Sequence, residues 1–205
     1  MKKVAVFASG RGSNFEQLCI AQKDKKNSAQ IALLIASKPG IGAIETAQNY
    51  AVPFQVFESK AYSNNDEYSD ALLTCLNDYK IDFIVLAGWL KLIHPRIVEA
   101  FSNRIINIHP ALLPLFGGKG MYGSHVHQAV WESGMLVSGA TVHMVDAEYD
   151  RGMIIKQACV SLDFNDTPES IAQKVLKVEH KIYPEALKML VENKIDFNNI
   201  KSRKN

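Results

Sequence analysis

Two apolar patterns alternate along the first half of the chain. Short runs in which nearly every residue is apolar are typical of strands buried on both faces of a parallel sheet. Between them, apolar residues recur at spacings of three and four, which predicts amphipathic helices packed on that sheet. The predicted strands are 3–9, 31–37, 54–57, 82–88 and 104–108, and the predicted helices begin near residue 13 and cover 41–50 and 65–79.

The pattern changes after residue 115. A glycine-rich loop, FGGKGMYGS (116–124), precedes a predicted helix at 125–133, strands at 138–145 and 153–162, and a long helix from about Pro168. This alternation predicts an α/β fold, with a Rossmann-like, mostly parallel sheet that carries helices on both faces. We expect a single domain at residues 1–195, with a mononucleotide-binding half at about 1–105, a second half at about 106–195, and a tail at 196–205.

Composition narrows the range of functions. The chain has 205 residues, of which 47% are hydrophobic and 21% charged, and its net charge is +2. This is typical of a globular protein and gives no electrostatic support for nucleic acid binding. No segment is apolar over the length that a membrane span needs. Cys19, Cys75 and Cys159 are far apart, which favours free thiols in a cytoplasmic protein over a disulfide framework or a zinc site.

The first candidate site is the turn GRGSN (10–14) after the first strand. Ligands of such sheets bind beyond the carboxyl ends of the strands. Backbone N–H groups of Gly12, Ser13 and Asn14 would face an anion at the start of the following helix. The turn lacks the Lys-Ser/Thr ending of a P-loop and the third glycine of a dinucleotide-binding fingerprint. A glycine turn capped by Ser13 or Asn14 is the alternative.

The second candidate site is VLAGWLKLIHP (85–95), which contains the end of another buried strand. The apolar residues after Gly88 would suit a crevice for a flat aromatic ligand. Ordinary core packing is the alternative interpretation of such a run.

The third candidate site combines IINIHPALLP (105–114) with the turn that holds Asp150. Asn107 and His109 are two residues apart in a strand, so their side chains should lie on the same side. Together the three residues could support acyl transfer. Asn107 would donate to a developing oxyanion, His109 would supply a proton or hydrogen bond, and Asp150 would orient the imidazole and raise its pKa. No serine or cysteine nucleophile accompanies them, so the nucleophile would belong to the substrate.

Five segments, taken in order and spacing, resemble the phosphoribosylglycinamide formyltransferases, a folate-dependent family of purine biosynthesis. They are GRGSN, VLAGWLKLI, NIHPALLP, DAEYDRG and VEHKIYP (178–184), and the resemblance extends over residues 4–191. It implies transfer of the formyl group of 10-formyltetrahydrofolate to the amine of glycinamide ribonucleotide. The products would be formylglycinamide ribonucleotide and tetrahydrofolate. The folate would be a cosubstrate, and no metal would be needed. The protein would be a monomer or homodimer, and its partners would be small molecules.

The resemblance also assigns roles to individual residues. It implies ribonucleotide binding by Gly12, Ser13, Asn14 and Glu179, and catalysis by Asn107, His109 and Asp150. It implies folate binding by Leu90, Lys91, Leu92, Ile93 and Asn107. Asn65 stands where some relatives carry a folate-contacting arginine, and it is included as a folate-binding candidate.

One further departure concerns the glycine-rich loop. After Leu-Leu-Pro many relatives have a short proline–glycine turn, whereas here the loop is longer, and His125 and His127 follow it. The alternative functions are a formyltetrahydrofolate deformylase, in which water replaces the amine, and a sugar-nucleotide formyltransferase. Formylation of methionyl-tRNA would call for a further domain and a basic surface. A nucleotide-binding module without turnover is the non-enzymatic alternative.

Overall fold

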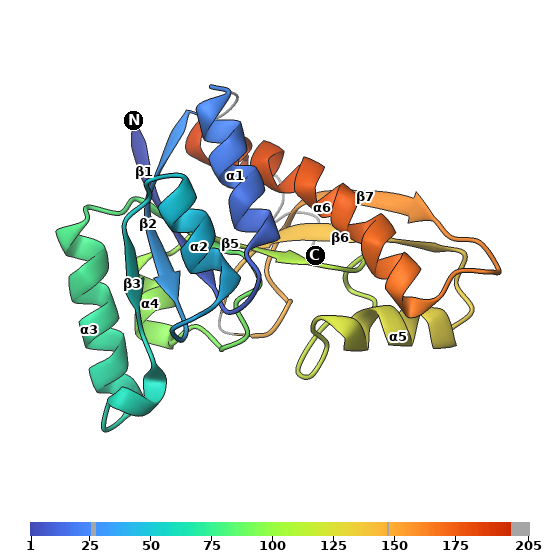
Figure 1. The fold of residues 1–205 in the computed structure, drawn as a ribbon, viewed down its shortest axis with the longest axis horizontal. Coiled ribbons are helices and arrows are strands. Elements are labelled where there is room, and N and C mark those ends of the chain that lie inside the picture. Colours follow the sequence, from blue (N-terminus) through green and yellow to red (C-terminus); the bar gives the residue numbers. More distant parts are fainter. Residues whose placement is uncertain (26–27, 147, 198–205) are drawn as a thin grey trace.

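A single seven-stranded sheet forms the centre of the molecule (Figure 1). The structure, a computed structural model, describes residues 1–25, 28–146 and 148–197. The strand order is β3-β2-β1-β4-β5-β6-β7. The strands are β1 (Lys2–Ala8), β2 (Ala29–Ala36), β3 (Phe54–Val56), β4 (Phe83–Leu86), β5 (Ile105–His109), β6 (Val137–Met144) and β7 (Ile154–Ser161). Strands β1 to β5 pair in parallel, whereas the β5–β6 and β6–β7 pairs are antiparallel, which confirms a mostly parallel α/β sheet.

Helices cover both faces of this sheet, as the apolar spacing predicted (Figure 1). They are α1 (Ser13–Lys23), α2 (Gly42–Asn49), η1 (Ser59–Ala61), α3 (Asn65–Asp78), α4 (Pro95–Ala100), α5 (Ser124–Glu132) and α6 (Pro168–Val191). Alternate residues of one strand enter different cores, because side chains of a strand alternate between faces. In β1, Val6 packs in the core beneath α1, α2 and α6, and Phe7 packs in the core beneath α3 and α4.

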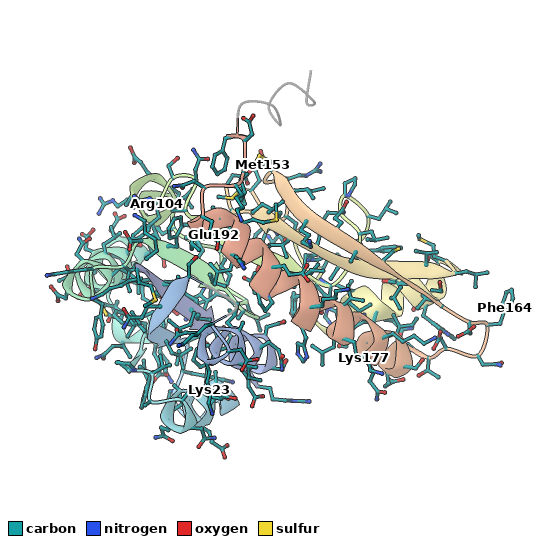
Figure 2. The ribbon with its side chains drawn as sticks, turned by 90° about the horizontal axis from the view of Figure 1, so that it is seen from above. Lys23, Arg104, Met153, Phe164, Lys177 and Glu192 are labelled. Atoms are coloured by element: carbon teal, nitrogen blue, oxygen red, sulfur yellow. The ribbon has the colours of Figure 1, made fainter. Side chains whose placement is uncertain are left out.

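Helix α6 crosses one face of the sheet (Figure 2). It carries Glu179 among its buried residues. Its start is capped by Thr167, whose side chain accepts from the Ser170 N–H. Near its middle, the buried Tyr183 hydroxyl donates to the carbonyl oxygens of Leu86 and Ile106, at 2.8 and 3.3 Å. These carbonyls belong to β4 and β5, so the hydrogen bonds hold this part of α6 over two neighbouring strands. Glu179 precedes Tyr183 by one helical turn.

One detail differs from the sequence-based expectation. No helix was predicted between the strands at 82–88 and 104–108, but Pro95 begins the short helix α4, with His94 as its N-cap. Pro suits this first position because its missing N–H would have no partner there. Residues 198–205 of the predicted tail lie outside the described residues. Among the helices that the structure describes, none has the length and apolar character that a membrane span requires.

Candidate active site

A cavity of about 300 Å³ opens where β4 and β5 end, at the edge predicted to bind ligands. It lies between loops from both halves of the chain and the middle of α6. Most of the candidate residues line it. These are Asn14, Leu90, Lys91, Leu92, Ile93, Asn107, His109, Asp150 and Glu179.

Asn107 and His109 both reach the cavity because they alternate with core residues in β5. Ile106 and Ile108 belong to the hydrophobic core, and the two polar side chains project from the strand between and beyond them. Strand β6 runs antiparallel to β5, and its register places His143 directly opposite Asn107. Because Asn107 and His109 both line the cavity, the structure agrees with the prediction that they share one side of the strand end.

The imidazole of His109 is held between two oxygen atoms. Its Nε2 lies 2.8 Å from the Phe116 carbonyl oxygen, and its Nδ1 lies 3.5 Å from Asp150 Oδ2. Burial lowers the pKa of His109, and His143 lowers it further, whereas Asp150 and the Phe116 carbonyl raise it. The net pKa is below the ordinary value. Asp150 thus raises the pKa of His109, as expected, but burial has the larger effect and sets the direction of the net shift.

Asp150 is positioned by the backbone as well as by charge. Its φ is +54°, a left-handed conformation that Asp adopts more readily than most residues. Its Oδ2 accepts the Gly118 N–H at 2.9 Å, so the glycine-rich loop is attached to the carboxylate. Gly117 allows this approach, since a Cβ there would lie 3.3 Å from the Asp150 Cβ. Burial raises the pKa of Asp150, but its contacts with His143, Gly118 and His109 outweigh burial and lower it.

His143 completes this polar group and was not identified from the sequence. Its Nδ1 lies 2.8 Å from the Met144 carbonyl oxygen, and its Nε2 lies 3.1 Å from Asn107 Nδ2 and 3.5 Å from Asp150 Oδ1. With its hydrogen on Nδ1, the neutral ring accepts from the Asn107 amide at Nε2, whereas in the protonated ring Nε2 would donate to Asp150 instead. The amide keeps a second N–H for another acceptor. The available signal was a lone histidine within the apolar run of 138–145.

The GRGSN turn and α6 meet through two polar side chains. Asn14 Nδ2 donates to Glu179 Oε2 at 2.6 Å. The buried Glu179 therefore has Asn14 as its partner, and burial still raises the pKa of this carboxyl to about 6. Gly12 is the N-cap of α1 with φ +84°, and no side chain caps the helix, so the alternative of a Ser13 or Asn14 cap is wrong. Gly12 and Ser13 lie beside the cavity in sequence but are not among the described residues that line it.

The segment 90–93 forms a more apolar part of the cavity wall. Leu90 and Leu92 are 57% and 48% exposed, so apolar surface is available there to a ligand. The Lys91 ammonium lies 5.6 Å from the Tyr68 ring centroid and 3.1 Å from Ser59 Oγ. Asn65 is exposed at the start of α3 and is not among the cavity-lining residues in the described part of the chain.

The described residues contain no group of three or more histidine, cysteine, aspartate or glutamate side chains arranged to hold a metal ion. The polar side chains that line the cavity instead include two amides, three imidazoles and four carboxylates. Such a set can stabilise a developing oxyanion and move protons in an acyl transfer.

Comparison with known proteins gives consistent matches over nearly the whole chain. A relative from Arabidopsis thaliana, phosphoribosylglycinamide formyltransferase, chloroplastic, is 46% identical over 96% of this chain and 68% of its own length. The Bacillus subtilis phosphoribosylglycinamide formyltransferase is 41% identical over 93% of this chain and 95% of its own.

Solved structures agree with this result. The crystal structure of phosphoribosylglycinamide formyltransferase from Bacillus halodurans has a TM-score of 0.88, with 36% identity, over 96% of this chain and 98% of its own. The family model described as formyl transferase matches residues 2–187. The chain therefore belongs to the formyl transferase family.

Proposed function

We propose that the protein transfers the formyl group of 10-formyltetrahydrofolate to the amine of glycinamide ribonucleotide. The products are formylglycinamide ribonucleotide and tetrahydrofolate, in the de novo synthesis of purines. The names of the Arabidopsis and Bacillus relatives support this acceptor, and their identity extends over most of the chain. The folate is a cosubstrate, and the reaction needs no metal.

The observation that carries the proposal is the composition of one cavity. Asn14 and Glu179 lie in one part of its wall, the apolar segment 90–93 lies in another, and the polar group of Asn107, His109 and Asp150 also lines it. A polar, phosphorylated acceptor and a flat, apolar formyl donor need different surfaces. They also need a polar reaction centre to which both have access.

The proposed chemistry takes place at the formyl carbon. The acceptor amine attacks it, a C–N bond forms, and the electron pair of the carbonyl moves to oxygen. The free N–H of Asn107 and the imidazole of His109 stabilise that oxyanion, and Asp150 favours the protonated form of the imidazole. Collapse of the intermediate breaks the bond to N10 of the folate. The proton lost by the amine ends on N10.

Substrate binding is divided between the two ends of the cavity. We assign the ribose phosphate to the backbone N–H groups of Gly12, Ser13 and Asn14 at the start of α1, where the helix dipole favours an anion. Glu179 binds the ribonucleotide beside Asn14. Leu90, Lys91, Leu92 and Ile93 receive the pterin, and we assign the folate tail to Asn65 at the exposed start of α3.

Location and assembly remain part of the proposal. Three free cysteines, one of them exposed, support a reducing compartment such as the cytoplasm. The plant relative is named as chloroplastic, so fractionation of the native organism is the relevant measurement. We propose a monomer or homodimer, which light scattering of the purified protein distinguishes.

The test of the proposed function is an initial-rate assay of folate absorbance. Purified protein and 10-formyltetrahydrofolate are mixed with and without glycinamide ribonucleotide. We expect tetrahydrofolate to form only when the ribonucleotide is present. Equal rates in both mixtures would identify a deformylase, and no reaction in either would favour a binding module.

A further inference from the structure

His127 is a buried polar residue of the cavity that the chemistry above does not use. It lies in the second turn of α5, where the neighbouring Val126 and Val130 belong to the buried core. The side chain of His127 is 7% exposed and lines the same cavity as His109 and Glu179. Its Nδ1 is buried and has no hydrogen-bond partner among the described residues.

An unpaired ring nitrogen is unfavourable in a packed helix–sheet contact. A buried polar atom loses its hydrogen bonds to water and gains none in return, whereas a leucine or valine at this position would carry no such cost. Nothing in the packing of α5 requires an imidazole. The cavity beside it offers the missing partner, because a bound ligand can supply the hydrogen bond.

The electrostatic surroundings keep this ring neutral. Burial lowers the pKa of His127, and the positive charge of His109 lowers it further. His127 keeps a lone pair, which is the form that accepts hydrogen bonds and protons.

The other two histidines of the cavity are less able to accept a substrate proton. The ring nitrogens of His109 face the Phe116 carbonyl oxygen and Asp150. Those of His143 face the Met144 carbonyl oxygen on one side, and Asn107 with Asp150 on the other. Both rings are thus engaged within the protein, in contrast to His127.

We propose that His127 is a further catalytic residue, which accepts a hydrogen bond from the acceptor amine and takes its proton as the C–N bond forms. The position fits the acceptor side of the cavity, because α5 packs against α6, the helix that carries Glu179 (Figure 1). His127 returns the proton to N10 of the folate as the bond between the formyl carbon and N10 breaks, so no net proton is consumed. The inference rests on the proposed function.

The test uses His127→Ala and His127→Asn, with His180→Ala as the matched control. His180 also has a buried ring nitrogen without a partner, on α6, but it does not line the cavity in the described part of the chain. We expect kcat to fall by about 100-fold in both His127 variants, a usual scale for an acid–base group, with the KM for folate nearly unchanged. Added imidazole should restore the activity of His127→Ala in a saturable manner, and His180→Ala should keep the kcat of the parent.

Two results would overturn the inference. One is a parent-like kcat in the His127 variants, and the other is a loss that imidazole does not restore in a folded His127→Ala. If the alanine variant does not fold, His127→Asn decides through its kcat at constant folate KM. A parent protein that shows no acceptor-dependent transfer would contradict the proposed function instead, so the two failures are distinct.

Discussion

At the scale of single residues, two carboxylates of the cavity lie in environments that shift their pKa values in opposite directions. Asp150 receives the Gly118 N–H and lies beside two histidines, so its pKa is lowered although burial acts against this. Glu179 has the Asn14 amide as its partner, and burial raises its pKa to about 6. Asp150 is therefore a permanent anion near neutral pH, and Glu179 changes charge just below it.

Replacing Asp150 by asparagine tests its electrostatic role. Asparagine tolerates the same left-handed backbone and can still accept the Gly118 N–H, so only the charge is lost. We expect kcat to fall by about 10²–10⁴-fold. The pKa of His109 should be lower than in the parent, because a nearby anion favours the imidazolium. Measurements of kcat and an NMR titration of His109 check this, and a parent-like kcat in the folded variant would remove Asp150 from the mechanism.

The Glu179→Gln substitution should separate stability from function. Because the pKa of this carboxyl is higher in the folded than in the unfolded protein, the neutral form favours folding. The contribution of the neutral Glu179 carboxyl to folding stability is fully present below about pH 4.5 and is lost as the pH rises through about 6. The variant should therefore be about 2 kcal/mol more stable than the parent at pH 8, and equally stable at pH 4.5.

Thermal unfolding at the two pH values measures this difference, and the KM for the ribonucleotide should rise in the same variant. A variant that is less stable than the parent at pH 8 would show that the carboxylate is well accommodated without substrate.

At the scale of elements, the turn before α1 depends on its contact with α2. Gly12 has φ +84°, and a Cβ there would lie 2.7 Å from the Ala43 Cα. A substitution at Gly12 would therefore affect more than phosphate binding, because α2 would have to move. Gly10, in the same turn, has no atom within 4 Å of its built Cβ.

Gly12→Ala should consequently lower stability by about 1–3 kcal/mol and raise the KM for the ribonucleotide, while Gly10→Ala leaves stability near the parent value. Thermal unfolding and ribonucleotide titration of both variants check this. If Gly12→Ala and the parent unfolded at the same temperature, the turn would accommodate a Cβ despite its positive φ angle and the close contact with Ala43.

Most elements were predictable because their signals are local. Continuous apolar runs gave the strands, and the face of Phe15, Leu18 and Cys19 gave α1. Helix α4 was missed because its six residues, which begin with Pro95, are too few to show a helical period. His143 was missed for a different reason: it meets Asn107 only through the antiparallel register of β6 on β5, which no local pattern contains. Asn107 and His109 were found because their two polar side chains share one strand end.

At the scale of the whole molecule, the cavity depends on both halves of the chain. Asn14 comes from the first βα turn, Glu179 comes from the last helix, and the catalytic candidates lie between them in sequence. The hydrogen bond between Asn14 and Glu179 joins residues 165 positions apart. The site therefore exists only in the complete fold.

We predict that the whole reaction needs no metal. The proposed chemistry uses protein donors and a substrate amine, so incubation with a chelator should leave the rate unchanged. Assays before and after EDTA treatment and dialysis check this. Activity that is lost on chelation and returns with a divalent cation would require a metal site that the proposed mechanism lacks.

The most direct measurement follows the formyl carbon itself. 10-Formyltetrahydrofolate labelled with carbon-13 in the formyl group is incubated with the protein and glycinamide ribonucleotide, and the products are identified by NMR and mass spectrometry. The account predicts that the label appears in formylglycinamide ribonucleotide in step with tetrahydrofolate. Label released as formate while the ribonucleotide stays unmodified would contradict it.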